Sequence, residues 1–285
     1  MTQVPEQARR GVLEADVREH KADFTGIYTA PDPRAYFRSL ARLDYQMPLS
    51  GLPVLRAALA ASGSCDSQRT VLDLCCSYGQ AAAMMSSPDG PGHVTARYLD
   101  PAIDALTPEE LARADARYYA AGPRSVRVAG LDSSRPALSY ALRAGLLSDG
   151  WCEDLERYEP SAALAAGLRE VGVIFCTGGV GYVGRQTFER LLLNVPDPGR
   201  LWLVIFVLRV FDYTPIASLL AGHGLVTERL PQTFPQRRFA NADEQEAALR
   251  DVRRRGLDPA GRESAGWFHA DCFVSRPARG GLSRT

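Results

Sequence analysis

The sequence predicts an α/β protein with a doubly wound, mostly parallel sheet of seven strands and added helical segments. Apolar runs typical of buried strands alternate with helical patterns along most of the chain. The first unit, residues 70–85, passes from an apolar strand through a turn of small residues into the start of a helix. Two strand patterns near the C-terminus predict an antiparallel hairpin at one edge, whereas right-handed crossovers make the other strands parallel.

Seven segments carry strand patterns, and helical patterns separate most of them. The segment 171–177 is apolar without interruption, as in a strand buried on both faces. Between the first two strands, residues 86–92 contain the proline and glycine residues that break a helix, and Thr107 and Pro108 predict the cap and first turn of a new one. The strands are expected at 70–73, 125–132, 150–156, 171–177, 201–208, about 225–230 and 267–275, and the helices at 81–85, 136–144, 161–168, 183–193, 215–222 and 243–254.

These elements predict two parts of unequal size. A helical cap or arm is expected over residues 1–66, and a Rossmann-type domain over residues 67–285, with a helical insertion at about 86–122. The first part is rich in aromatic residues, namely Tyr28, Tyr36, Phe37 and Tyr45. Ordinary packing explains these rings as well as a lid over a ligand does, and the sequence leaves both interpretations open.

The composition indicates which kinds of partner the protein is expected to bind. The 33 Lys and Arg residues balance the 33 Asp and Glu residues, so the net charge gives no attraction to nucleic acid or to an anionic membrane. The N-terminus is polar and the longest apolar run is far too short to span a bilayer, which predicts a soluble, cytoplasmic protein. The 6 cysteines form no C-x-x-C pair and the 4 histidines are scattered, so no metal is expected. A small-molecule substrate is the expected partner, and an oligomer is compatible with the sequence.

Acidic or small residues follow several predicted strands at the point where each strand ends. Asp73 precedes a turn of small residues, Asp132 ends the second strand, and Asp154 follows the third. A glycine-rich segment, 177–182, follows the fourth strand. In open α/β sheets, ligands bind in the crevice at the carboxyl ends of the strands. The strand ends therefore predict one ligand site, although an acidic residue at a strand end is often only a helix cap.

The segment from Asp73 to Gly79 resembles the first motif, D-x-G-x-G-x-G, of class I S-adenosylmethionine-dependent methyltransferases. Cys75 and Ser77 stand at two of the three glycine positions, and only Gly79 matches. The resemblance implies a seven-stranded methyltransferase fold that binds S-adenosylmethionine as methyl donor or substrate. It also implies that Asp73 and the loop residues Cys75, Ser77 and Gly79 approach the methionine part of that ligand.

The same resemblance assigns the other strand ends. It implies that Asp132, with Ser133, binds the ribose hydroxyls, because a charged acceptor in a dry crevice favours a diol. It places Asp154 and Leu155 next to the adenine. The segment that begins at Thr177 and Gly178 would face the reactive sulfonium.

The segment 177–182 itself suggests how a sulfonium could be held. It contains no acidic residue and no histidine, but it offers glycines and the aromatic ring of Tyr182. An aromatic ring attracts a cation, so Tyr182 and Thr177 are the catalytic candidates. Further along the chain, Arg209 is expected to bind a carboxylate of the ligand or of an acceptor, and Arg237 with Arg238 is expected to form a solvated or interface patch.

A closer resemblance is to a bacterial group of methyltransferase-like proteins that includes azetidine-2-carboxylate synthases. Segments 31–37, 43–45, 73–79 and 179–182 carry it. In those synthases the α-amine of S-adenosylmethionine displaces methylthioadenosine from the γ-carbon and closes a four-membered ring. The resemblance implies a cyclase or lyase of secondary metabolism that makes azetidine-2-carboxylic acid and methylthioadenosine.

Two alternatives to the cyclase stay open. One is a transferase that methylates a small molecule, and the other is a catalytically inactive methyltransferase-like domain that senses a ligand. The bulky residues of the first loop would change how the methionine chain lies, which favours the cyclase. Sequence variation of this loop in an ordinary methyltransferase explains the bulky residues equally well. Ring closure would need a folded substrate and a deprotonated amine rather than a second substrate.

Overall fold

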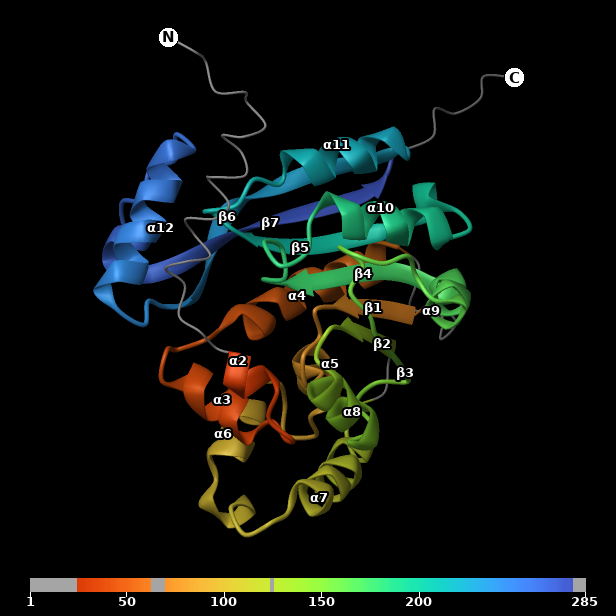
Figure 1. The fold of residues 1–285 in the computed structure, drawn as a ribbon, viewed down its shortest axis with the longest axis vertical. Helices are drawn as coiled ribbons and strands as arrows, with labels where there is room; N and C mark the ends of the chain where they lie inside the picture. Colours follow the sequence, from red (N-terminus) through yellow and green to blue (C-terminus); the bar gives the residue numbers. More distant parts are fainter. Residues whose placement is uncertain (1–24, 63–69, 124–125, 279–285) are drawn as a thin grey trace.

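The computed structural model describes residues 25–62, 70–123 and 126–278. These residues build one seven-stranded sheet in the order β3-β2-β1-β4-β5-β7-β6 (Figure 1). The first five strands pair in parallel, and β7 pairs antiparallel with both β5 and β6. The strands are β1 (Thr70–Leu74), β2 (Arg127–Asp132), β3 (Asp149–Cys152), β4 (Val171–Thr177), β5 (Trp202–Leu208), β6 (Leu225–Arg238) and β7 (Trp267–Pro277). The predicted fold class, a class I methyltransferase-like Rossmann sheet, is confirmed.

The strand order fixes where a ligand can bind. The chain runs outward from β1 to β3 on one side and returns through β4 on the other, so the order reverses between β1 and β4. Asp73, near the end of β1, pairs with Gly130 of β2 and with Phe175 of β4. A crevice forms at such a switch point, outside the carboxyl ends of the strands.

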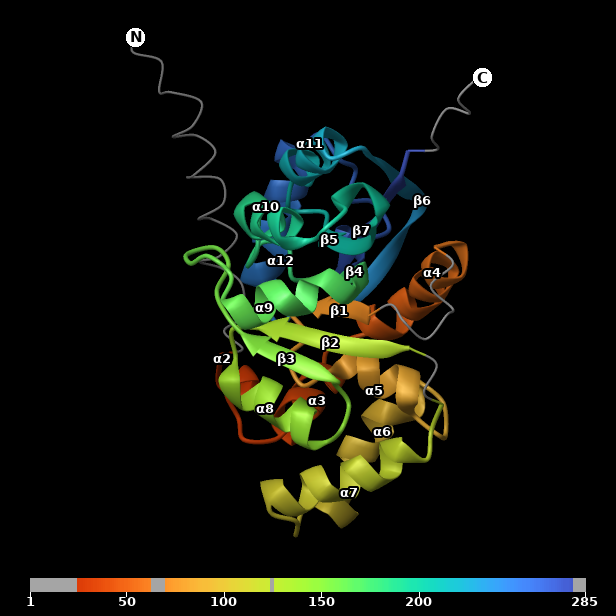
Figure 2. The same ribbon diagram turned by 90° about the vertical axis from the view of Figure 1, so that its right-hand side faces the viewer.

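Helices cover both faces of the sheet (Figure 2). On one side lie α9 (Ala162–Gly167), α10 (Arg185–Asn194) and α11 (Thr214–Gly222). On the other side lie α4 (Met47–Ala61), α5 (Gln80–Ser86) and α8 (Arg135–Arg143), with α2 (Thr25–Tyr28), α3 (Arg34–Ala41), α6 (His93–Leu99) and α7 (Pro108–Ala120) beyond them. The last helix, α12 (Ala242–Arg254), lies between β6 and β7 in the sequence.

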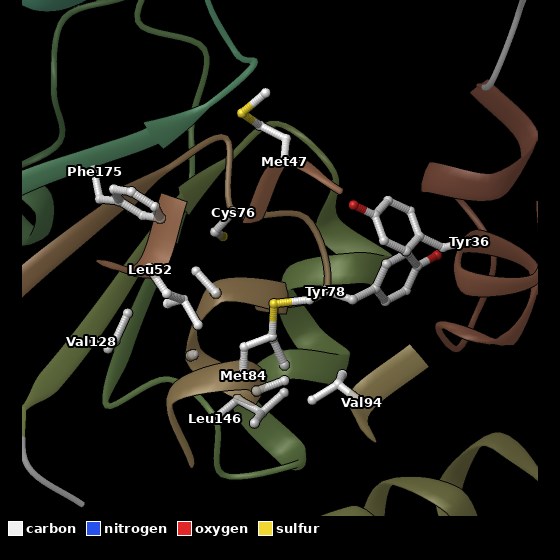
Figure 3. Close-up of a cluster of buried hydrophobic side chains, with 14 of the residues drawn as sticks. Tyr36, Met47, Leu52, Cys76, Tyr78, Met84, Val94, Val128, Leu146 and Phe175 are labelled. Atoms are coloured by element: carbon white, nitrogen blue, oxygen red, sulfur yellow. The ribbon is translucent and has the colours of Figure 1, made fainter. Parts of the chain in front are cut away.

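Alternation along the strands gives each face its own core. Val71 and Phe175 belong to the cluster that includes α4, α5 and α8, part of which Figure 3 shows. Their neighbours Leu72 and Ile174 belong to the cluster with α10 and α11. Because both faces are covered, β4 and β5 are almost entirely apolar, as the segment 171–177 predicted for β4.

The helix α4 is part of the main core, although the sequence suggested a separate cap up to residue 66. A Cβ atom built on Gly51 of α4 would lie 3.0 Å from the ring of Phe175 and 3.1 Å from that of Phe206. The helix therefore packs directly on β4 and β5, and the absence of a side chain at Gly51 allows this close approach. Residues 1–24 and 63–69 lie outside the described part of the chain, so the division at residue 66 stays a prediction.

The edge strand β6 is longer than the predicted segment of about 225–230. It continues to Arg238 through Pro231 and Pro235, which interrupted the sequence pattern. Proline is tolerated in an edge strand because its missing N–H faces outward. The pairing with β7 is irregular at two places, between Arg229 and Thr233 and between Pro235 and Arg237. These irregularities accommodate the two prolines. The extension carries β6 to the carboxyl end of β4.

The helical insertion between α5 and β2 is anchored by one buried carboxylate. Thr107 and Glu110 form the capping box that starts α7, as Thr107 and Pro108 predicted. Asp115 of α7 is fully buried. Its oxygens accept hydrogen bonds from Arg97 at 2.6 and 2.9 Å and from the hydroxyl groups of Tyr98 and Tyr140, each at 2.6 Å. Asp115 thus joins α6, α7 and α8.

We expect Asp115→Ala to lower the free energy of unfolding by about 3–5 kcal/mol, because it leaves a partly buried guanidinium and two buried hydroxyl groups without their acceptor. Urea denaturation measures the change. The control is Glu109→Ala on the same helix, where an exposed carboxylate is removed from Arg143 and the expected change is within about 0.5 kcal/mol. Equal small losses in both variants would show that Asp115 does not hold the insertion in place.

Candidate functional site at the carboxyl ends of β1, β2 and β4

The loop after β1 keeps a glycine-type backbone although two of its three motif positions are not glycine. Cys75 has φ 62°, Ser77 has φ 50° and Gly79 has φ 73°, all in the left-handed region. This conformation costs a residue with a side chain about 1–2 kcal/mol. The substitution of Cys75 and Ser77 for glycine has therefore changed the side chains of the loop while the chain path expected of the motif is retained.

The carboxylate of Asp132, at the end of β2, holds this loop in place. Its Oδ2 accepts a hydrogen bond from the Ser77 N–H at 2.8 Å, and its Oδ1 accepts one from the Ser134 N–H at 2.7 Å. The Cys75 N–H donates to the Leu131 carbonyl at 2.8 Å. Burial raises the pKa of Asp132 above its ordinary value, although the N–H groups of Ser134 and Ser77 counteract part of the rise. Each carboxylate oxygen keeps a lone pair for a ligand.

Two further polar groups at this loop are buried. Burial of Asp73 together with the charge of Asp132 raises the pKa of Asp73 to about 8. The Ser77 hydroxyl is buried and has no hydrogen-bond partner among the described residues. Buried polar groups are almost always paired, so the Ser77 hydroxyl suits a polar ligand at the loop.

The end of β4 packs tightly against the loop after β1. The thiol groups of Cys75 and Cys176 are hydrogen bonded, and with burial this raises the pKa of Cys75 well above its ordinary value. A Cβ atom on Gly179 would lie 2.7 Å from either sulfur atom, so only glycine fits there. Gly178 has φ 91° and donates its N–H to the Phe206 carbonyl at 3.2 Å. The structure thus brings Thr177 and Gly178 beside the loop of Cys75 and Ser77.

Tyrosine residues from the segment before β1 surround these strand ends. The Tyr45 hydroxyl lies 3.4 Å from the Thr177 carbonyl, and the Tyr36 hydroxyl donates to Gln80 Oε1 at 2.6 Å. Burial raises the pKa of Tyr28, and its neighbours Tyr182 and Asp132 raise it further. Burial likewise raises the pKa of Tyr45. These hydroxyl groups stay protonated at neutral pH and can donate hydrogen bonds.

The loop itself holds the tyrosine segment in place. The Tyr78 hydroxyl hydrogen bonds with the carbonyl groups of Ile27 and Ala30 at 2.9 and 2.8 Å. Its ring lies next to that of Tyr36, with 5.6 Å between the ring centres (Figure 3). Sequence reasoning identified these rings but could not choose between packing and a lid, because their contacts join segments far apart in the chain.

Within the described part of the chain, the side chains of three predicted site residues show no polar contact with the loop after β1. Asp154 accepts a hydrogen bond from the Glu156 N–H at 3.0 Å in the turn after β3. The Leu155 side chain is 3% exposed and packs in the cluster with α10, so it points into the core. Ser133 is exposed, and its carbonyl accepts from the Cys152 thiol. The adenine contacts of Asp154 and Leu155 and the ribose contact of Ser133 stay predictions.

Tyr182 is 59% exposed, so it lies at the surface of the site rather than in a dry centre. Its N–H donates to the Gly179 carbonyl at 2.9 Å in a tight turn after β4. Its neighbour Tyr28 is half-buried, and its pKa is raised by burial and also by the nearby Asp132 and Cys75, so it lies near the strand ends. A catalytic role of Tyr182 and Thr177 stays a prediction, and Tyr28 and Tyr45 join them as candidates.

The expected roles of two arginines are wrong. Arg209 is buried and pairs with Glu263 at 2.6 Å, so it binds a carboxylate of this chain. Arg237 is also buried, paired with Glu244 at 2.6 Å, rather than part of a solvated patch. Only the neighbouring Arg238 is exposed. Arginine is hard to place from sequence because its long side chain reaches partners on other elements.

The described residues contain no group of three or more His, Cys, Asp or Glu side chains arranged to hold a metal ion. None of the helices in this part of the chain is both long enough and apolar enough to cross a membrane.

Comparison with solved structures finds methyltransferases. The plantazolicin methyltransferase BamL, in complex with a triazolic desmethylPZN analog and SAH, has a TM-score of 0.48 and 13% identity, over 94% of this chain and 99% of that one. BpumL, another plantazolicin methyltransferase in complex with SAH, has a TM-score of 0.43 and 12% identity, over 95% and 99%. A SAM dependent methyltransferase from Aquifex aeolicus has a TM-score of 0.38 and 10% identity, over 92% and 98%.

These likenesses carry no conclusion about substrate or reaction, because every TM-score among the three is below 0.5. A scan against protein-family models gives no match, and neither does a comparison with curated protein sequences. The fold assignment rests on the strand order and the antiparallel β7 of this chain.

Asp73 gives the site a testable pH dependence. Between the ordinary pKa of an aspartate and its raised value of about 8, the native state holds a proton that the unfolded chain has released. Raising the pH through this range therefore favours unfolding, by at most about 1.4 kcal/mol per pH unit. We expect Asp73→Asn to flatten this dependence in urea denaturation from about pH 5 to pH 8. The exposed residue Asp197 supplies the control Asp197→Asn, which should follow the wild type; a wild-type curve as flat as that of Asp73→Asn would contradict the raised pKa.

Proposed function

We propose that this chain binds S-adenosylmethionine at the carboxyl ends of β1, β2 and β4 and transfers its methyl group to a small-molecule acceptor. The observation that carries the proposal is the loop after β1. It has left-handed residues at all three motif positions, and its Ser77 N–H is held by Asp132, a carboxylate that still has lone pairs for a ribose diol. The same loop is followed at once by α5, whose first N–H groups lie at the edge where the methionine carboxylate would bind.

The charges at the site suit a cationic ligand. Asp132 is close enough to Asp73 to raise its pKa, and neither carboxyl group forms an ion pair with an arginine among the described residues. The sulfonium and ammonium groups of S-adenosylmethionine would supply positive charge. The unpaired Ser77 hydroxyl would then hydrogen bond with the methionine part. In this arrangement Cys75 and Gly79 contribute backbone groups.

The residues at the end of β4 would form the part of the site where the methyl acceptor binds. Thr177 and Gly178 would lie next to the sulfonium, with Tyr28 and Tyr45 across from them. Aromatic rings stabilise a sulfonium by attraction between the cation and the ring face. The exposure of Tyr182 leaves this side open to a second substrate, which favours methyl transfer over a sealed reaction of S-adenosylmethionine alone.

Cyclisation of S-adenosylmethionine to azetidine-2-carboxylic acid is the second candidate. Its support is the set of tyrosines near the strand ends, of which Tyr36 and Tyr78 are buried, together with a segment 177–184 that has no acidic residue and no histidine. In this reaction the α-nitrogen attacks the γ-carbon, the carbon–sulfur bond breaks, and methylthioadenosine leaves with the bonding electrons. The α-ammonium group loses one proton to solvent before this attack, and the ring nitrogen keeps the other two protons as the ammonium of the product. No acceptor and no strong base would be required.

Asp132→Ala tests the binding part of the proposal. We expect it to weaken binding of S-adenosylmethionine by about 1.5–3 kcal/mol, the contribution of hydrogen bonds to a charged group. Isothermal titration calorimetry on correctly folded protein measures the change. Asp149→Ala is the control, because Asp149 is an exposed aspartate at the opposite end of β3. Unchanged affinity in Asp132→Ala would remove this residue from the ribose role.

The products formed from S-adenosylmethionine decide the reaction. For a methyltransferase, we expect purified protein to leave S-adenosylmethionine intact until an acceptor is added, and then to release S-adenosylhomocysteine. A cyclase would release methylthioadenosine and a cyclic amino acid with no acceptor present, at a rate that rises with pH until the bound amine is deprotonated. Mass spectrometry separates these products. Methylthioadenosine without an acceptor would overturn methyl transfer, and binding of S-adenosylmethionine without either product would favour the ligand-sensing alternative.

A further inference from the structure

Gln236 occupies an irregular position near the end of β6. The pairing of β6 with β7 shifts its register between Pro235 and Arg237, so Gln236 is the extra residue of a bulge. Such bulges re-aim a side chain and are frequent beside active sites. The Gln236 carbonyl accepts a hydrogen bond from the Gln46 N–H at 2.8 Å, which fixes the bulge to the segment that carries Tyr45.

The carboxamide of Gln236 is buried against the end of β4. The residue is 7% exposed, and its Oε1 atom has no hydrogen-bond partner among the described residues. Its Nε2 atom would lie 2.8 Å from a Cβ atom on Gly178, so the missing side chain of Gly178 leaves room for the carboxamide. An unpaired buried amide oxygen costs about 1–3 kcal/mol, which makes it a candidate for contact with a ligand.

The surroundings of this oxygen favour a hydrogen-bond donor as its partner. The adjacent Arg237 is held by Glu244 through hydrogen bonds of 2.6 and 2.9 Å, so its charge is balanced within the chain. The Tyr45 hydroxyl lies 3.4 Å from the Thr177 carbonyl, and Asp73, Cys176 and Arg237 are near enough to affect its pKa. An anionic group would meet the unpaired oxygen and the strand-end carboxylates unfavourably, whereas an O–H or N–H group would pair with the oxygen.

We propose that Gln236 binds the acceptor substrate, and that its Oε1 atom accepts a hydrogen bond from a hydroxyl or amino group of that substrate. The inference rests on the proposed methyl transfer, because Gly178 is where the sulfonium would lie. It narrows the acceptor to an uncharged or cationic molecule with a donor group within reach of the methylated atom.

Small aromatic probes test this donor contact, since tyrosine rings surround the site. Phenol and aniline carry the donor, and anisole and N,N-dimethylaniline are the matched compounds without it. Ligand-observed NMR titrations would be made on wild-type protein saturated with S-adenosylhomocysteine. We expect the donor compounds to bind about tenfold more tightly than their methylated counterparts.

Three variants separate the contact from a structural role. Gln236→Met keeps the side-chain volume but removes the hydrogen-bond acceptor. In this variant the ratio of the two dissociation constants, methylated probe to donor probe, should fall close to one. Gln236→Glu keeps an acceptor oxygen and should retain the preference. Gln232→Leu, an exposed position on the same strand, should behave as the wild type. Thermal unfolding adds a second readout: since the oxygen is unpaired, Gln236→Met should be at least as stable as the wild type, whereas a structural role predicts a loss.

The outcomes are distinct. An unchanged preference in Gln236→Met, no preference in the wild type, or a destabilised Gln236→Met overturns the inference. Failure of the wild type to bind S-adenosylhomocysteine overturns the proposed function instead, and the probe titrations are then made on the protein alone. If the protein alone prefers the donor probes and Gln236→Met loses this preference, the contact between Gln236 and a donor group stands although methyl transfer does not.

Discussion

Two backbone N–H groups from different loops converge on the carboxylate of Asp132, and the geometry of the site depends on this convergence. Ser77 and Ser134 donate to it from the loops after β1 and β2. Cys75 and Ser77 are left-handed, at a cost of about 1–2 kcal/mol each. A hydrogen bond to a charged group contributes about 1.5–3 kcal/mol, so the bond from Ser77 N–H to Asp132 is of the right size to offset the cost at Ser77. The Cys75 N–H donates to the Leu131 carbonyl. Contacts with the end of β2 therefore support the two residues that stand in place of glycine.

The second constraint joins the start of the described chain to its end. The segment 43–46 lies along the end of β6, with hydrogen bonds of 2.7 Å from Arg238 N–H to the Leu43 carbonyl and 2.8 Å from Gln46 N–H to the Gln236 carbonyl. It covers the end of an otherwise open edge strand. Tyr45 is thereby placed over β4, and Gln236 beside Gly178. What the sequence presented as an N-terminal cap and a C-terminal hairpin is one wall of the site.

The features that could be predicted from the sequence are those encoded by neighbouring residues. The alternation of strands and helices predicted the fold class, and Thr107 with Pro108 predicted the start of α7. Asp132 could be singled out because a strand ended there. Tertiary structure decided the rest. Arg209 pairs with Glu263, far along the chain, and the length of β6 depends on its edge position, which makes Pro235 acceptable. Nothing in the sequence pattern singled out Gln236 as a site residue, because its position depends on a bulge in β6 and on Gly178, which is distant in the sequence.

The protonation of Asp73 connects the electrostatics of the loop with the kind of ligand it can hold. With its pKa raised to about 8, Asp73 keeps its proton at neutral pH beside the charged Asp132. A cationic ligand stabilises the ionised form of a nearby carboxyl group, so its binding would release that proton. The positive charge of the ligand would then replace the proton as the partner of the carboxylates. An anion has no such exchange available, because it would keep Asp73 protonated and add a second negative charge beside Asp132. The same preference holds at Gln236, whose unpaired oxygen also requires a donor. Both ends of the site thus select against negative charge, one through carboxyl groups and the other through an amide.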